Sequence, residues 1–272
     1  MILVQTAMLD VDHIVFQNFL LVLVLSLALF LLFGGFARLY CKGKRFQKED
    51  RSTTELTMFL SNNGFMGFPI TMAFFGNIGL LYMVANNVAM SIFAFTYGVS
   101  AINRGTQDKN TAGFSERFFR FLKSLANPNI IAAIGGILLC YSGVKLPSAA
   151  TGFLETVGTI AGPMAMVSVG TMLAGSFGLH SFKKRAVLEP VISKLFIVPA
   201  MATVILWFLP LEPMAKMVLI LANLLPSAAI VPLLCEQYGK DKRLASEIVV
   251  VSTLISMVSI PFGMWVLGLI GF

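Results

Sequence analysis

Charged side chains are scarce in this sequence. They make up 12% of its 272 residues, whereas hydrophobic residues make up 57%. Soluble domains carry about a quarter charged residues, so the composition excludes a soluble protein. Apolar runs of about 20 residues, the length that a bilayer requires, fill nearly the whole chain. The sequence therefore predicts an all-α polytopic membrane protein with no soluble domain of useful size.

Cysteine and histidine are also few. Cys41, Cys140 and Cys235 are odd in number and widely spaced, which argues against a disulfide framework and against a metal site. His13 and His180 lie far apart, and the sequence has no HExxH, GxSxG or P-loop motif. No pair of carboxylates lies within the apolar runs for intramembrane proteolysis. We expect no catalytic residue, no metal and no cofactor, in a protein that is not an enzyme.

Eight stretches are long enough to cross a membrane. They cover residues 14–40, 54–75, 79–102, 129–143, 147–177, 187–209, 212–237 and 244–270. The fifth is long enough to hold a short helix before the Gly162-Pro163 step and the main span after it. Between the third and fourth, phenylalanines and basic residues alternate at helical spacing over residues 113–126. We expect an interfacial helix there, with a calmodulin-type target as the alternative.

The basic residues are distributed as in a membrane protein. The net charge is +7, but sixteen of the 20 Lys and Arg lie in four loops, at residues 42–51, 104–123, 183–185 and 240–243. The connections between these loops carry almost none, which is the positive-inside pattern and not a nucleic-acid surface. We expect a multi-pass protein of the cell (plasma) membrane with these loops in the cytoplasm and both termini outside.

Two of the eight stretches are interrupted midway. The interruptions are NNGFMGFP at residues 62–69 and NLLPS at residues 223–227. A helix that stops inside hydrocarbon leaves backbone groups that lipid cannot satisfy, so each break must face protein or a watery cavity. Two breaks, one in each half of the chain, indicate a transporter with a binding site near the membrane midplane. The alternative is a pair of ordinary kinks, since Gly and Pro are common in membrane helices.

The two breaks supply polar groups without a buried carboxylate. We expect Gly64 and Gly67 to allow unusual backbone angles and close approach. A half-helix restarting near Pro69 would direct its N–H groups at the break, where an anion is favoured. Asn62 and Asn63 add donors and acceptors, and the second break offers the same kinds of group. The candidate substrate-binding residues are Asn62, Asn63, Gly64, Gly67, Pro69, Asn223, Pro226, Ser227 and Lys194.

Lys194 lies about eight residues into its stretch, roughly 12 Å from the cytoplasmic end at 1.5 Å per residue. Glu189 is on nearly the opposite face of the same helix and does not neutralise it. Two interpretations have equal weight: the cation faces a cavity or partner, or it snorkels to the interface. We expect Glu247 to snorkel or to pair with a loop base. We also expect Asn86 and Asn87 to bond a neighbouring helix rather than line the cavity.

At the breaks the chain resembles the auxin efflux carrier family, which belongs to the superfamily of bile-acid sodium symporters. The matching segments are SNNGFMGFPI, NPNIIAAIGGILL, AGPMAMVSVGTMLAG, KLFIVPA and the stretch from PSAAIVPLLCEQYGKDKR to MVSIPF. The resemblance implies ten helices in two inverted five-helix repeats, with two broken helices crossing at the substrate. By this pattern eight of the ten helices are present, because the chain begins inside what would be the second.

The expected organisation follows from the resemblance. Residues 1–13 would be the remnant of a truncated helix and residues 14–102 the first-repeat helices of the transport domain. Residues 103–126 would form the cytoplasmic loop with its interfacial helix, and residues 127–272 a complete five-helix second repeat.

We expect a secondary membrane transporter, a permease or efflux carrier, that moves small organic anions such as malate- or auxin-like carboxylic acids by alternating access. A non-transporting sensor or assembly subunit that retains the ligand site is the alternative, and a channel is a third option. The expected partners are a small organic anion and the lipid bilayer, with a homodimer left open and no nucleic acid.

Overall fold

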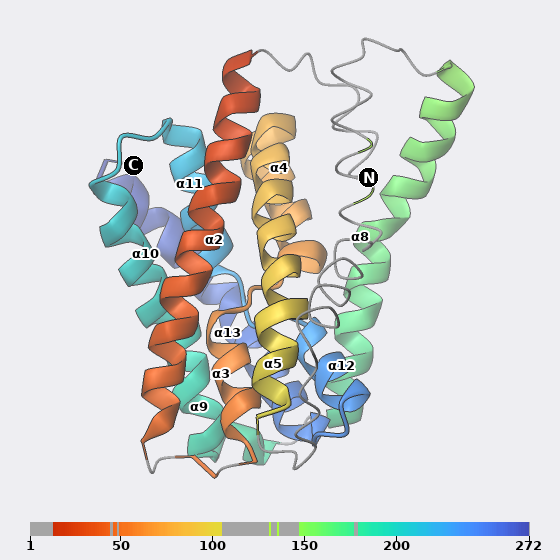
Figure 1. Ribbon diagram of the computed structural model, residues 1–272. Helices are drawn as coiled ribbons and strands as arrows, with labels where there is room; N and C mark the ends of the chain where they lie inside the picture. Colours follow the sequence, from red (N-terminus) through yellow and green to blue (C-terminus); the bar gives the residue numbers. More distant parts are fainter. Residues whose placement is uncertain are drawn as a thin grey trace, which may run out of the picture.

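The computed structural model describes residues 13–43, 46–47, 49–104, 147–176 and 179–271, together with residues 131 and 135. All its regular elements are helical (Figure 1). The long ones are α2 (His13–Lys42), α3 (Arg51–Phe59), α4 (Phe68–Phe93), α8 (Ser148–Ser176), α9 (Arg185–Ile192), α10 (Val198–Trp207), α11 (Pro213–Leu224), α12 (Ile230–Gln237) and α13 (Lys242–Leu269). Short elements are α5 (Val99–Ile102), the 3-10 helix η3 (Leu179–Lys183) and the π-helical turns η1 (Asn63–Gly67), η2 (Ala94–Gly98) and η4 (Ser193–Ile197).

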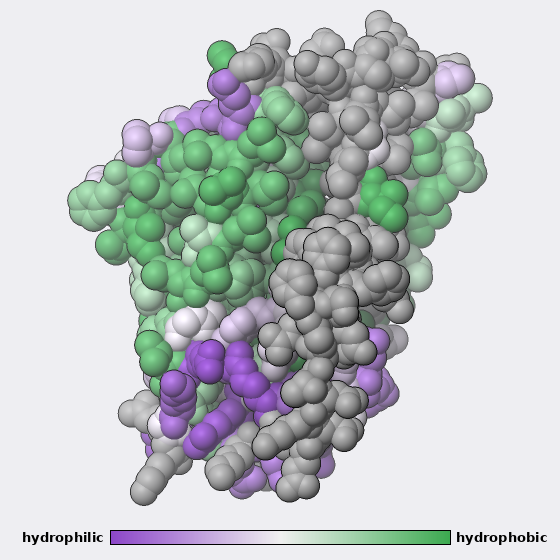
Figure 2. Space-filling model, viewed as in Figure 1, coloured by the Kyte–Doolittle hydropathy of each residue, from purple (hydrophilic) through white to green (hydrophobic). Residues whose placement is uncertain are grey.

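The prediction of an all-α membrane protein is confirmed. Four described helical stretches are long and apolar enough to cross a membrane: Ile14–Lys42, Asn63–Ile102, Arg185–Trp207 and Lys242–Leu269. Figure 2 shows a broad hydrophobic band across one face, with hydrophilic residues gathered at both ends. The eight-span count and the inverted repeat stay predictions. The expected helices over 113–126 and 129–143, and the remnant before His13, lie outside the described residues or almost wholly so.

The stretch Asn63–Ile102 is a hairpin of two antiparallel arms. Its turn is at Gly76, whose φ of 62° and ψ of −154° leave the helical region and favour glycine. A Cβ atom on Gly79 would lie 2.2 Å from Cβ of Phe75, so the turn requires a glycine there as well. The side chains of Asn63 and Asn86 are 2.7 Å apart, whereas 23 residues of straight helix would separate them by about 35 Å. The expected division between residues 75 and 79 is confirmed.

The helix α8 stands at the side of the bundle (Figure 1), where it contacts α13 and η1. We expected a step at Gly162-Pro163, and this was wrong, because α8 continues through Pro163. A single proline removes one backbone hydrogen bond, and a long membrane helix tolerates that loss.

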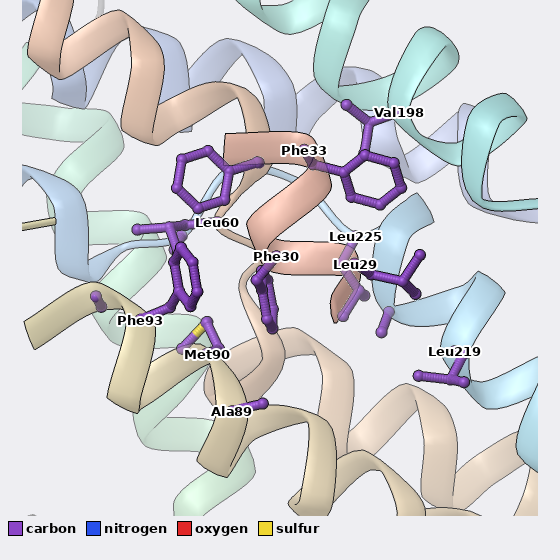
Figure 3. Packing of buried hydrophobic residues seen from close by; sticks show 14 of the residues in the cluster. Leu29, Phe30, Phe33, Leu60, Ala89, Met90, Phe93, Val198, Leu219 and Leu225 are labelled. Carbon is purple, nitrogen blue, oxygen red and sulfur yellow. The ribbon is translucent and has the colours of Figure 1, made fainter. Parts of the chain in front are cut away.

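The core of the bundle lies between α2, α3, α4, α10 and α11. Stacked and edge-to-face rings fill it: the ring centroids of Phe30 and Phe93 are 6.0 Å apart, and those of Phe59 and Phe93 are 6.1 Å apart. Leu60 and Leu225, one from each break, pack into the same core (Figure 3). Both breaks are therefore embedded in the packed interior.

The described parts of the four basic loops lie at one end of the bundle, the lower end in Figure 1. Asp50, before α3, and Asp241, before α13, come from opposite halves of the chain, and the charge of Asp241 acts on Asp50 there. Burial raises the pKa of the Asp50 carboxyl group, and the charge of Asp241 raises it further. The topology and the side of the membrane on which these loops lie stay predictions.

Candidate functional site

The two breaks lie against each other and bond through their backbones. The N–H group of Asn62 donates to the carbonyl oxygen of Pro226 at 2.9 Å, and the N–H group of Ala228 donates to that of Leu60 at 2.9 Å. These two bonds form a short antiparallel bridge between the breaks. Backbone groups that a broken helix leaves open in the membrane interior are thereby satisfied. Both predicted interruptions are present, and they meet.

The first half-helix restarts earlier than we expected. It begins at Asn63, not near Pro69, with the π-helical turn η1. The carbonyl oxygen of Asn62 accepts bonds from the N–H groups of Met66 and Gly67, at 3.1 and 3.0 Å. Pro69 lies two residues beyond η1, inside the helix, because the wider turn accommodates a residue that lacks an N–H group. The positive end of this half-helix therefore lies directly beside the second break.

The two glycines of the first break differ in their surroundings. A Cβ atom on Gly67 would lie 2.8 Å from Cδ1 of Leu225 and 3.3 Å from Sδ of Met83, so the expected close approach is confirmed. Gly64 is exposed, and a Cβ atom there would meet nothing within 4 Å. The expectation of unusual backbone angles was wrong for both, because neither has a positive φ. Gly64 thus leaves open space at the start of the half-helix.

The two asparagines of the first break are buried and only partly bonded. Nδ2 of Asn63 donates to Oδ1 of Asn86 at 2.7 Å, and Nδ2 of Asn86 donates to Oγ of Ser26 at 2.8 Å. These two hydrogen bonds confirm that Asn86 bonds a neighbouring helix, and they also connect the first break to α2. Among the described residues, Nδ2 of Asn62 and Oδ1 of Asn63 have no hydrogen-bond partner. Unpaired buried polar atoms cost about 1–3 kcal/mol each, so a ligand that bonds them would be stabilised.

The polar residues of the second break, Asn223 and Ser227, form hydrogen bonds with neighbouring protein groups. Oγ of Ser227 donates to the carbonyl oxygen of Thr57 at 2.7 Å, and its N–H group donates to Oγ of Ser252 at 3.2 Å. Nδ2 of Asn223 donates within α11 to the carbonyl oxygen of Leu219 at 2.8 Å. Ser227 is fully buried and Asn223 is 5% exposed. The open side of the crossing is therefore on the first break.

Lys194 lies at the crossing, so the snorkelling interpretation was wrong. Its side chain is fully buried, and Nζ donates to Oγ of Ser61 at 2.7 Å and to the carbonyl oxygen of Asn223 at 3.1 Å. One ammonium group thus bridges both breaks. As expected, Glu189 does not neutralise it and pairs with Arg185.

Sequence reasoning missed Ser61 as a member of this cluster. A small hydroxyl residue directly before the asparagine pair of an interrupted helix was the signal that could have identified it. Ser193, next to Lys194 in the sequence, also went unnoticed, and its buried Oγ has no partner in the part of the chain that the structure describes. Of these two serines, Ser61 contacts the ammonium group and therefore belongs to the polar cluster of the crossing.

The electrostatics of the crossing favour an anion. It combines a buried ammonium group, an unpaired amide donor and the open N-terminus of a half-helix. The buried carboxylates among the described residues pair with basic residues other than Lys194. Glu55 pairs with Arg104 at 3.2 Å, and Glu247 pairs with Lys184 at 2.7 Å. The pairing of Glu247 with a loop base is as expected. Among the described residues, no cluster of His, Cys, Asp and Glu could hold a metal ion.

Helical architecture, an apolar exterior and two broken helices that meet at a polar crossing define an integral membrane protein of the transporter class. The family described as "Membrane transport protein" matches residues 5–264. The chain belongs to this family, and the resemblance seen in its sequence is confirmed.

Two archaeal relatives are similar. A protein of Methanothermobacter thermautotrophicus named "Uncharacterized transporter" is 25% identical over 202 residues, which are 74% of this chain and 63% of the relative. An "Uncharacterized transporter" of Methanocaldococcus jannaschii is 27% identical over 222 residues, which are 78% of this chain and 67% of the relative. The chain spans about two thirds of the length of these relatives.

Proposed function

We propose that the protein is a secondary carrier that moves small organic anions, such as mono- or dicarboxylic acids, across the cell membrane by alternating access. The observation that carries this proposal is the backbone pairing of the two breaks, Asn62 to Pro226, with the Lys194 ammonium group beside it. A closed crossing of two broken helices supplies a binding site that is not a continuous pore.

The choice of an anion rests on the groups that remain free. A carboxylate at the start of the half-helix would meet the positive helix end near Gly64 and the unpaired amide donor of Asn62. Nζ of Lys194 lies at the same crossing and is the basic group that can carry a positive charge there. The unpaired oxygen of Asn63 can accept a bond from a hydroxyl group of the substrate, which suits hydroxy acids.

Alternating access would come from movement of the bundle against α8. The open side of the first break, at Gly64 and Phe65, is exposed, and η1 contacts α8. The rest of the crossing is held inside a single hydrophobic core. A bundle that shifts as one body along α8 would uncover this side of the crossing first at one membrane surface and then at the other.

Counterflow of radiolabelled malate in proteoliposomes tests the proposal. We expect saturable exchange with the wild-type protein and its loss in Asn62→Ala, Asn63→Ala and Asn223→Ala. Asn77→Ala is the matched control, because Asn77 is exposed at the hairpin turn, away from the crossing. Unchanged exchange in all three variants would refute the site. Binding of malate in a thermal-shift assay without counterflow under any gradient would favour the non-transporting sensor instead.

A further inference from the structure

Lys194 places a cation at the centre of the crossing without a carboxylate to balance it. In the part of the chain that the structure describes, its ammonium group bonds only to neutral oxygens, Oγ of Ser61 and the carbonyl oxygen of Asn223. Burying a charge is costly unless it is compensated. Here the compensation comes from dipoles, because Asn223 lies in the last turn of α11, the negative end of that half-helix.

The oxygens around Lys194 are the kind that hold an alkali cation. In transporters with broken helices, unwound backbone carbonyls and the C-terminal ends of half-helices bind Na⁺. The first break contributes the hydroxyl of Ser61. The second contributes the carbonyl oxygen of Asn223. The ammonium group is thus held by one oxygen atom from each break, the kinds of oxygen that also bind a monovalent cation.

We infer that Lys194 is a tethered substitute for a coupling cation. Its ammonium group fills a monovalent-cation site between the two broken helices and supplies the positive charge that a bound anion requires. Transport consequently needs no Na⁺. The transport part of this inference rests on the proposed function, whereas the occupancy of a cation site by the lysine does not.

Removal of the side chain tests the cation site without any substrate. In Lys194→Ala, the space left by the four-carbon stem and the ammonium group is lined by the same oxygens, so small cations can enter it. We expect Na⁺, Li⁺ or ethylammonium to raise the thermal unfolding temperature of the purified Lys194→Ala protein by a few degrees, relative to choline at equal ionic strength. The wild-type protein should not distinguish these cations from choline.

Two control variants separate charge from space. Lys194→Met fills the space with apolar atoms, so it should be destabilised and should gain nothing from small cations. Lys242→Ala removes a lysine whose side chain is 56% exposed and paired with Glu236, and it should also gain nothing. Absence of cation-specific stabilisation in Lys194→Ala, or equal stabilisation of Lys194→Met by the same cations, would overturn the inference.

A transport assay covers the case in which Lys194→Ala does not fold. The wild-type protein should exchange malate equally in sodium and choline media. In Lys194→Met the rate of malate exchange should fall roughly tenfold or more, the scale of a charge-assisted contact. A wild-type protein that exchanges malate only with Na⁺ would contradict the inference and leave the carrier function intact. Cation-specific stabilisation without any anion exchange would support the inference and refute the carrier function.

Discussion

The hydroxyl group of Tyr82 donates a hydrogen bond to Oε2 of Glu212 at 2.6 Å. At the other end of the same hairpin arm, the hydroxyl group of Tyr97 donates to the carboxylate of Glu55. Glu212 directly precedes α11 in the second broken helix, and Glu55 lies in α3 of the first. The second arm of the hairpin, residues 79–102, is therefore bonded at one end to the second broken helix and at its other end to the first. This arrangement favours movement of the crossing as one rigid unit.

Tyr82→Phe should weaken this attachment. The phenol is fully buried, and its loss leaves Glu212 with the Nδ2 donor of Asn18 at 3.0 Å. We expect the free energy of unfolding to fall by about 1–2 kcal/mol, measured by thermal or denaturant unfolding in detergent. Glu212→Gln keeps an oxygen acceptor for the phenol and should lose less. Equal stability of Tyr82→Phe and the wild type would show that the bond does not hold the arm.

Gly67→Val should force the two breaks apart. Its side chain would collide with Leu225 and Met83 in a fully packed interior, and overpacking of this kind costs about 1–3 kcal/mol. Gly64→Val is the matched control, because it introduces the same β-branched residue into the same helical turn where space is open. We expect Gly67→Val to have the lower unfolding temperature. The reverse order would contradict the close packing of the breaks.

Glu247→Gln and Glu236→Gln compare an ion pair whose carboxylate is buried with one in which both side chains are exposed. Glu247 is 3% exposed and receives Lys184 at 2.7 Å, whereas the side chains of Glu236 and Lys242 are both 56% exposed. We expect a loss of about 1–3 kcal/mol for Glu247→Gln and under about 1 kcal/mol for Glu236→Gln. Unfolding at low and high salt checks the difference, since salt should abolish only the exposed contribution. Similar losses of unfolding free energy in both variants would be inconsistent with burial of the Glu247 carboxylate.

The interruptions could be predicted from sequence because they depend on local chemistry. Asparagine, glycine and proline within apolar stretches are costly in a helix, so residues 62–69 and 223–227 could be identified as helix breaks. Their pairing could not be derived in the same way, since the bond from Asn62 to Pro226 joins positions more than 160 residues apart. A meeting of the breaks was instead implied by the resemblance to the auxin efflux carrier family and favoured by the position of both breaks near the middle of their spans.

Other features were beyond local reasoning because tertiary packing decides them. An apolar helix shows no polar stripe to reveal which face of it carries Lys194 into the crossing. Proline rules located the half-helix start near Pro69, but the π-helical turn moved it to Asn63. The same rules predicted a step at Pro163, where α8 continues. At both prolines the cost was one missing backbone hydrogen bond, and the packing of the surrounding structure outweighed that cost.

Protection of a cysteine at Gly64 by substrate tests the binding site most directly. The substitution Gly64→Cys would be made in a background in which Cys41, Cys140 and Cys235 are replaced by serine. The space at this position is open, so a small maleimide should modify the thiol. Saturating malate should slow this modification markedly and leave that of Asn77→Cys unchanged. Equal rates at position 64 with and without malate and other small carboxylates would contradict the claim that the crossing binds an organic anion.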